Sequence, residues 1–278
     1  MFAALSYGEG QNRRLRRWWR KAVGERIVPQ KIPVGRGECF FVAQVTPGAR
    51  IRWEELFTCM GKLSREMVLP DGIIPPEGCG ITPFVPQALE PRIVMNTAAE
   101  LLTQGGGSRV PVTIFDPHGR LCSAVIPIVR VCADVRIVTG NTALYRRAGE
   151  RIMEEYGASV QIRPPGEAAL CGGVAVFPFG CGGASVPTNT IAIVPQEEPA
   201  GENLLAVRGI RLGEEIRCLK PEGISDFLFA SALYEKCALR ELGSRAGAEF
   251  VRGGEVLPWS EAAAFCGTRV EKSLDFRG

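Results

Sequence analysis

An α/β fold built around a parallel sheet is the architecture that the centre of this sequence predicts. Between residues 109 and 200, short apolar runs alternate with segments of helical periodicity, and strands that alternate with helices form parallel sheets with right-handed crossovers. The runs are apolar at nearly every position, which is typical of strands covered on both faces. The expected strands are 110–115, 135–139, 158–162, 174–177 and 190–194.

The spatial order of these strands follows from the same alternation. We expect the order 3-2-1-4-5, in which the chain returns to the centre after its third strand and continues outward on the other side. This order places a ligand crevice at the carboxyl ends of the first and fourth strands.

Helix signals separate the strands. A helical stretch is expected after the turn at 116–120, up to about Val131, and Pro127 is able to kink or shorten it. Asn141 is a suitable N-cap for a helix that runs through Tyr156. Gly157 follows at the position where helices commonly stop.

Regions of α/β character flank this core. We expect three regions, 1–108, 109–200 and 201–278, with a boundary at the glycine-rich stretch 105–108 and with the last region packing on the core or on the first. The first contains strand-like runs over 26–32 and 38–45 and helical patterns over 53–63 and 91–103. The last contains strand-like runs over 204–207, 215–219 and 249–251, a helix from Ser225 to about Leu242 and a short helix after Ser260.

The composition favours a globular cytosolic protein. Of the 278 residues, 46% are hydrophobic and 23% are charged, close to the average of folded domains. No apolar run reaches the ~18 residues needed to span a bilayer, and the N-terminus lacks the apolar stretch of a signal peptide. The ten cysteines are dispersed, without a C-x-x-C pair and with a single histidine. We therefore expect reduced, mostly buried thiols and no metal site.

Basic residues concentrate near the N-terminus. Seven of them and one acid lie between Arg13 and Arg26, and residues 11–23 have the periodicity of an amphipathic helix with Trp18 and Trp19 on its apolar face. Three contacts remain open for this helix. It docks on the body of the protein or on a second copy in a homo-oligomer, it binds nucleic acid through residues 13–26, or it binds an anionic membrane surface.

The turn after the first predicted strand carries the first candidate site. It reads Asp116-Pro117-His118-Gly119-Arg120. In this architecture the turn meets the start of a helix, where free N–H groups attract anions. Gly119 lets the backbone approach a ligand, and Arg120 is able to pair with a phosphate.

Two further segments follow the second and fourth predicted strands. They read Val138-Thr139-Gly140-Asn141 and Val176-Phe177-Pro178-Phe179-Gly180. Together with the turn, they resemble the Rossmann-type NAD(P)-binding domains of the shikimate dehydrogenase and glutamyl-tRNA reductase type, over about ninety residues. This resemblance implies an NADP or NAD cofactor. Gly119 and Arg120 would meet its phosphates, Thr139 and Asn141 its adenosine ribose, and Gly180 and Gly182 would border the nicotinamide.

The turn departs from the pattern of such domains. At the spacing of the G-x-G-x-x-G fingerprint the chain offers Asp116, His118 and Leu121. An aspartate at the first position brings a negative charge close to a pyrophosphate unless Arg120 or a metal compensates for it. The end of the second strand also lacks the acid that usually binds the ribose of NAD. The turn is therefore either an altered nucleotide site or a structural turn, since Asp and Pro are good turn formers.

The chemistry is left open at this point. Asp116 and His118 are the catalytic candidates. The segments 114–121 and 137–141 also resemble the first two motifs of haloacid-dehalogenase phosphatases, but His118 stands where that family has an acid, and no carboxylate lies in 178–185 to hold Mg²⁺. Cys181 in the glycine-rich loop would need His118 to activate it as a nucleophile.

Two functions remain. The first is a nucleotide-binding protein, with an NAD(P)-dependent oxidoreductase as its enzymatic form. The alternative is a non-catalytic regulatory or scaffold protein on a degenerate core, which interacts through its basic N-terminal helix.

Overall fold

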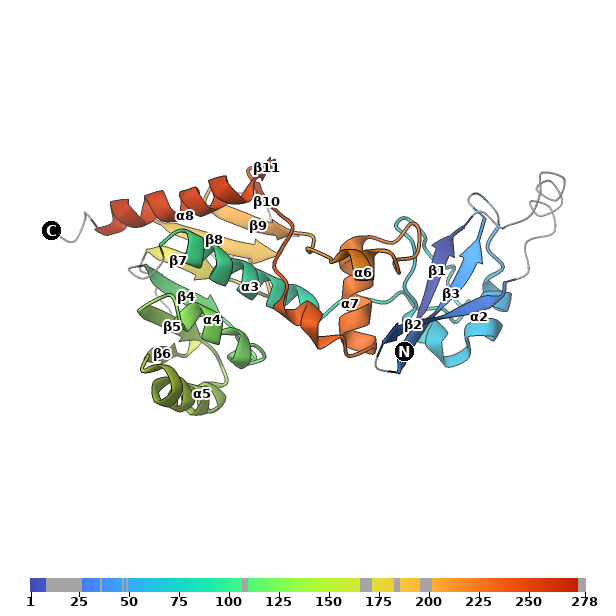
Figure 1. Ribbon diagram of the computed structural model, residues 1–278, viewed down its shortest axis with the longest axis horizontal. Helices are drawn as coiled ribbons and strands as arrows, with labels where there is room; N and C mark the ends of the chain where they lie inside the picture. Colours follow the sequence, from blue (N-terminus) through green and yellow to red (C-terminus); the bar gives the residue numbers. More distant parts are fainter. Residues whose placement is uncertain are drawn as a thin grey trace. The chain divides into compact units, whose positions relative to one another are not determined.

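The computed structural model describes residues 1–8, 27–35, 37–46, 48, 50–106, 110–165, 172–182, 186–195 and 202–274, drawn as a ribbon in Figure 1. The chain divides into two compact units. Unit 1 comprises Met1–Leu89 and Leu212–Leu242, and unit 2 comprises Glu90–Arg211 and Gly243–Gly278. The basic helix expected over 11–23 lies outside the described residues.

An eight-stranded sheet organises unit 2. Its order is β11-β10-β9-β8-β7-β4-β5-β6, and the six strands from β9 to β6 are parallel. The predicted order 3-2-1-4-5 is confirmed by β4 to β8, and β9 adds a sixth parallel strand, which gives the 3-2-1-4-5-6 order of dinucleotide-binding doubly wound sheets. The strands are β4 (Pro111–Phe115), β5 (Asp134–Val138), β6 (Val160–Arg163), β7 (Gly173–Val176), β8 (Thr190–Pro195), β9 (Leu204–Arg208), β10 (Glu249–Arg252) and β11 (Glu255–Leu257). Unit 2 is thus a Rossmann-like α/β fold.

The centre of this sheet is buried on both faces, as its continuous apolar runs predict. Every residue of β7 and β8 is buried. Gly173 begins β7 with a φ of 89°, and a Cβ at this position would collide with the main-chain oxygen of Pro111 on β4. Only a glycine lets these two central strands lie this close.

Helices of unequal length join the strands. Between β4 and β5 the chain forms the 3-10 helix η4 (Cys122–Ala124) and the four-residue helix α4 (Ile126–Val129). Pro127 shortens this element because it lacks an N–H and its ring blocks a continuous helix from the turn. Helix α5 (Thr142–Tyr156) begins at the N-cap Asn141 and ends at Gly157, which has a φ of 64°, so both predicted ends are confirmed.

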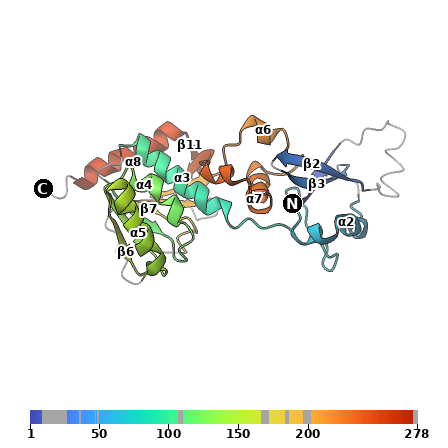
Figure 2. The same cartoon turned by 60° about the horizontal axis from the view of Figure 1, so that its bottom comes forward.

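Two longer helices complete unit 2. Helix α3 (Leu89–Gln104) precedes β4, and Thr97 on it accepts a hydrogen bond from the backbone of Gly247 near β10. Helix α8 (Trp259–Leu274) contacts β7 and β10. Helices α4 and α5 lie beside β4, β5 and β6 in Figure 1, and α5 lies beside β6 in Figure 2 as well.

Unit 1 contains a three-stranded sheet of order β1-β3-β2. Strand β1 (Ala3–Tyr7) is parallel to β3 (Glu38–Val45), and β2 (Pro29–Gly35) is antiparallel to it. Helix α2 (Trp53–Met60) and the 3-10 helix η2 (Gly61–Glu66) follow. The rings of Phe2 and Phe40 stack with centroids 5.0 Å apart, and Phe229 of helix α7 (Asp226–Lys236) packs edge-on against both, which forms part of the core.

The tail corrects one expectation. Residues 215–219, expected as a strand, belong mostly to helix α6 (Glu214–Arg217). Glu214 and Glu215 stand in its first turn, where acidic side chains favour a helix. Helix α7 (Asp226–Lys236) begins at the predicted N-cap Ser225. It ends before Leu242 because Ala238 takes a positive φ of 50°, and the 3-10 helix η6 (Arg240–Ser244) follows.

No helix in the described part of the chain combines the length and apolar character that a bilayer crossing requires.

Candidate functional site

The parallel sheet brings the predicted segments to one edge. Phe115 pairs with Val138, and Ile114 pairs with Val176, so the carboxyl ends of β5, β4 and β7 lie in a row. The chain leaves β4 toward β5 and leaves β7 toward β8, in opposite directions along the sheet. This divergence is the switch point at which doubly wound proteins bind their ligands.

The carboxylate of Asp116 organises the turn after β4. Asp116 is fully buried. Its Oδ1 accepts a hydrogen bond from the N–H of Arg120 at 3.0 Å, and its Oδ2 accepts one from the N–H of Leu121 at 2.8 Å. The main-chain oxygen of Asp116 accepts from the N–H of Gly119 at 3.1 Å. Three successive N–H groups of the turn therefore donate inward to one residue.

Tyr145 completes this buried network. Its side chain descends from α5, is 1% exposed, and donates its hydroxyl to Oδ2 of Asp116 at 2.8 Å. Burial, and then the charge of Asp116, raises the pKa of Tyr145 well above its usual range. Burial also raises the pKa of Cys122, beside Tyr145. The phenol thus stays protonated and donates, and the thiol stays protonated and is a poor nucleophile.

The turn after β4 is fastened to the start of α5. The N–H of Gly140 donates to the main-chain oxygen of Pro117 at 3.1 Å. Gly119 has a φ of 71°, and a Cβ there would come within 2.9 Å of the Cβ of Asn141. The structure therefore brings together Gly119 and Asn141, two residues expected to bind the cofactor.

The end of β5 holds the next two candidates. Thr139 is buried, and its Oγ1 accepts a hydrogen bond from the N–H of Asn141 at 3.0 Å. The Oδ1 of Asn141 accepts from the N–H of Leu144 at 3.3 Å, which caps α5. Asn141 is exposed as a whole, and its side-chain oxygen holds the helix.

Aromatic rings line the switch point itself. Phe115, at the end of β4, stacks on Phe177, which follows β7, with ring centroids 4.2 Å apart. Phe115 is partly exposed and Phe177 is buried. His118 meets the partly exposed Phe179 edge-to-face at 6.2 Å. The structure thus brings a histidine of the turn to the loop after β7.

The loop after β7 carries the last two candidates. Gly180 and Gly182 have φ values of 87° and 56°, in the left-handed region that favours glycine. The N–H of Gly180 donates to the main-chain oxygen of Phe177 at 3.1 Å, which closes a turn. Residues 183–185 of this loop lie outside the described part.

The charged side chain exposed at this edge is that of Arg120, because Asp116 is buried. His118 and Arg120 are exposed. Asp116 is the sole carboxylate in segments 115–121, 138–141 and 177–182, and it is fully buried. Side chains here therefore favour an anionic ligand, whereas the N–H groups of residues 119–121 are not available to it.

Tyr145 is the residue of this site that was not predicted from the sequence. The sequence feature that could have indicated it is a tyrosine on the buried face of a helix, because a buried hydroxyl needs a hydrogen-bond partner.

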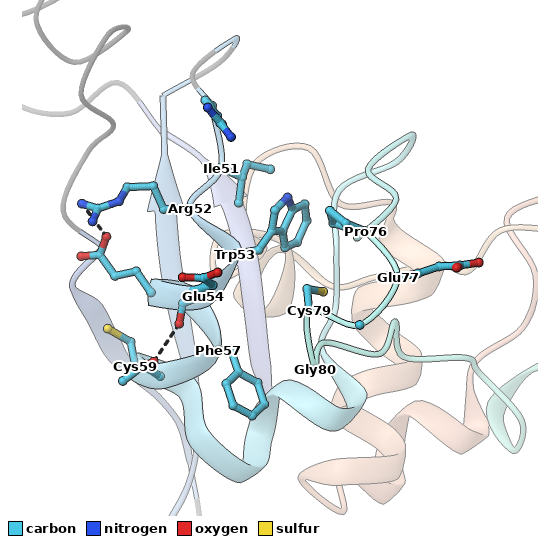
Figure 3. A pocket seen from close by; sticks show the side chains of 14 residues that line it. Ile51, Arg52, Trp53, Glu54, Phe57, Cys59, Pro76, Glu77, Cys79 and Gly80 are labelled. Carbon is cyan, nitrogen blue, oxygen red and sulfur yellow. Dashed lines mark hydrogen bonds and ion pairs between the residues drawn. The ribbon is translucent and has the colours of Figure 1, made fainter.

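A separate pocket lies within unit 1 (Figure 3). It has a volume of about 1370 Å³ and lies between α2 and the loop 76–80. Trp53, Pro76 and Cys79 turn toward the same space. The guanidinium of Arg52 pairs with the carboxylate of Glu55 at 2.9 Å. Most of the lining is exposed, so the pocket is an open concavity, and it contains none of the predicted site residues.

Among the residues that the structure describes, no three His, Cys, Asp or Glu side chains gather closely enough to hold a metal ion.

No protein-family model and no curated protein matches this sequence. Among solved structures, the chain is similar to the L-tryptophan dehydrogenase from Nostoc punctiforme, with a TM-score of 0.28 and 11% sequence identity. That match covers 86% of this chain and 77% of the dehydrogenase chain. The strand order of unit 2 itself defines the class, a Rossmann-like α/β protein.

Proposed function

We propose that this chain binds a nucleotide-type ligand at the carboxyl edge of β4, β5 and β7, through a modified version of the Rossmann-type site. The observation that carries this proposal is the switch point between β4 and β7. The partly exposed ring of Phe115 lies there, stacked on the buried Phe177, and the side chains of His118 and Arg120 are exposed beside it. Aromatic faces beside basic groups suit a ligand that joins a flat ring to an anion.

Each predicted residue takes a role in this proposal. The exposed parts of Phe115 and Phe179 offer faces to a base or to a nicotinamide ring. Arg120 pairs with a phosphate. The exposed side chain of Asn141 meets the ribose at the end of β5, and the buried Thr139 holds the backbone of Asn141 in place. Gly180 and Gly182 allow the loop after β7 to approach the ligand closely.

NAD and NADP are candidate ligands that fit this edge in part. The aromatic and basic side chains suit them, and the 3-2-1-4-5-6 strand order is the one that dinucleotide-binding sheets share. The turn does not fit a pyrophosphate, because Asp116 already holds its N–H groups. We therefore assign no hydride-transfer step. His118 is the catalytic candidate exposed at this edge. Asp116 acts as a positioning residue.

A thermal-shift and calorimetry panel tests the proposal. Adenosine, AMP, ADP-ribose, NAD(H) and NADP(H) are added at millimolar concentration. A ligand at 100 times its Kd stabilises the folded state by ~2.7 kcal/mol. We expect at least one phosphate-bearing member to raise the melting temperature. Arg120→Ala should weaken that effect, whereas the matched variant Arg65→Ala, at an exposed arginine of unit 1, should leave it unchanged. No shift with any member would contradict the proposal.

The scaffold function stays as a second candidate, because the turn N–H groups of residues 119–121 are used internally. This function would act through the basic segment 13–26. Deleting residues 1–24 is an unsuitable test, since it removes β1, whose residues Ala3, Ala4 and Leu5 are in the core. Replacing Arg16, Arg17 and Arg20 by glutamine keeps β1. A homo-oligomer that dissociates in this triple variant, measured by light scattering, favours the scaffold function, and an unchanged mass and partner binding count against it.

A further inference from the structure

The turn after β4 contains a buried carboxylate, that of Asp116, at the place where a bound phosphate would lie. In doubly wound dinucleotide-binding proteins, the N–H groups of this turn and of the following helix bind the ligand's pyrophosphate. Here the N–H groups of Gly119, Arg120 and Leu121 donate instead to Asp116. The buried carboxylate accepts from the N–H groups of Arg120 and Leu121, and the main-chain oxygen of the same residue accepts from the N–H of Gly119, so all three are occupied where a diphosphate would need them.

The helix after the turn does not offset the negative charge of Asp116. Helix α4 has four residues and begins five positions beyond Leu121, after the 3-10 helix η4. Its dipole is therefore weak, and its first residue does not adjoin the turn. A long helix in this place normally supplies the partial positive charge that attracts a pyrophosphate.

The carboxylate is also fixed in place. Tyr145 donates to Oδ2 from α5, and the contact of Gly119 with Asn141 holds the turn against the same helix. The charge of Asp116 cannot turn away from an approaching ligand without breaking three side-chain hydrogen bonds. A diphosphate that approached the N–H groups of the turn would come close to the negative charge of Asp116, and like charges repel strongly where water is excluded.

We propose that Asp116 determines the specificity of this edge by excluding a diphosphate from the turn, so that the ligand is a nucleoside or a nucleoside monophosphate. This inference rests on the proposed nucleotide-binding function. The base lies against Phe115 and Phe179, and a single phosphate faces the exposed guanidinium of Arg120, away from the buried carboxylate. NAD, NADP and ADP-ribose carry a diphosphate bridge and are the ligands that the turn disfavours.

The first test uses the wild-type protein and matched ligands. Calorimetry compares AMP with ADP-ribose, which share the adenosine monophosphate half and differ by the second phosphate and its ribose. We expect AMP to bind at least about tenfold more tightly, a difference of about 1.4 kcal/mol. ADP-ribose binding as tightly as AMP, or more tightly, overturns the inference and leaves the proposed function standing. No binding of either ligand, nor of adenosine, overturns the proposed function itself.

The second test removes the charge. Asp116→Gly frees the N–H groups of Arg120 and Leu121 and gives the turn a fingerprint-like glycine, and Asp116→Asn keeps an acceptor without the charge. We expect either variant to reduce the ratio of AMP affinity to ADP-ribose affinity at least about threefold. The matched control Asp71→Asn, at an exposed aspartate of unit 1, should keep the wild-type ratio. A folded Asp116 variant that also keeps that ratio contradicts the role of Asp116, and the wild-type comparison decides the matter if neither variant folds.

Discussion

The hydroxyl of Tyr145 donates a hydrogen bond to Oδ2 of Asp116 over 2.8 Å, in a buried contact between helix α5 and the turn after β4. The same carboxylate accepts from the N–H groups of Arg120 and Leu121. Asp116 therefore sets the shape of the turn and occupies its N–H donors. A ligand at this edge must then be bound by side chains, although the fold is of the dinucleotide-binding type.

Tyr145→Phe should destabilise the protein by about 1.5–3 kcal/mol, the usual contribution of a hydrogen bond to a charged group. Urea unfolding measures this change. Tyr156→Phe is the matched control, because its hydroxyl accepts from Arg130 at an exposed position. The control should lose less than about 0.5 kcal/mol. Equal losses in the two variants would show that the buried bond is not a major contributor.

Asp116→Ala should cost more than Tyr145→Phe, because it leaves two buried N–H groups and a phenol without their acceptor. Each unsatisfied buried group costs roughly 1–3 kcal/mol, so we expect a loss of at least about 3 kcal/mol in urea unfolding. Asp71→Ala removes an exposed carboxylate and should change stability by less than about 0.5 kcal/mol. A loss at Asp116 no greater than that at Asp71 would refute the network.

Gly173→Ala should destabilise the sheet by about 2 kcal/mol or more, because the methyl group collides with Pro111 and the backbone has a positive φ. Gly72→Ala separates the two effects. Gly72 has a similar φ of 80° but no atom within 4 Å of its Cβ position. Thermal unfolding should show a clearly smaller loss for Gly72→Ala, and equal losses would mean that the close approach of β4 and β7 has no measurable cost.

Stability should fall as the pH rises from about 9 to 12. Burial raises the pKa of Cys132 to about 12 and that of Cys266 to about 12, from an ordinary value of 9.0. Within this window the thiols are protonated in the folded chain and ionised in the unfolded one, so the folded state binds more protons. The free energy of unfolding then drops by up to roughly 1.4 kcal/mol per pH unit for each thiol.

Urea titrations at pH 9, 10 and 11 measure that slope. Cys132→Ala should make it shallower. Cys59→Ala, at an exposed cysteine, should leave it unchanged. A slope that is the same in all three proteins would rule out the buried thiol of Cys132 as its source.

Most of the sheet could be predicted from sequence, and the reason is physical. Strands buried on both faces need apolar residues at nearly every position, so β4, β7 and β8 are visible as nearly continuous apolar runs, whereas β5 carries Asp134 and Arg136 and is recognised by its alternation. Asn141 and Gly157 mark helix ends because capping is a local interaction. Strand β1 was missed, because a single short apolar run gives no sign of its long-range pairing with β3. The run 215–219 was wrong, because its brief apolar alternation outweighed the acidic helix start at Glu214.

The candidate site was predictable only in its position. Strand order places the segments after β4, β5 and β7 at one edge, and that much follows from topology. The partners of Asp116 could not be predicted, because the bond from Tyr145 joins residues 29 apart in sequence. The face of α5 shows the same limit. Tyr145 and Ile152 are buried, but the apolar side chains of Leu144 and Tyr156 are 41% and 37% exposed.

Photolabelling tests the central claim, that the carboxyl edge of β4, β5 and β7 is the ligand site, most directly. The wild-type protein is irradiated with 8-azido-AMP, digested and mapped by mass spectrometry, with and without excess AMP. We predict that the label lies in peptides containing residues 115–121 or 177–182 and that AMP competes it away. Label that AMP does not displace, or that lies only in unit 1 around Trp53 and Cys79, would contradict the assignment.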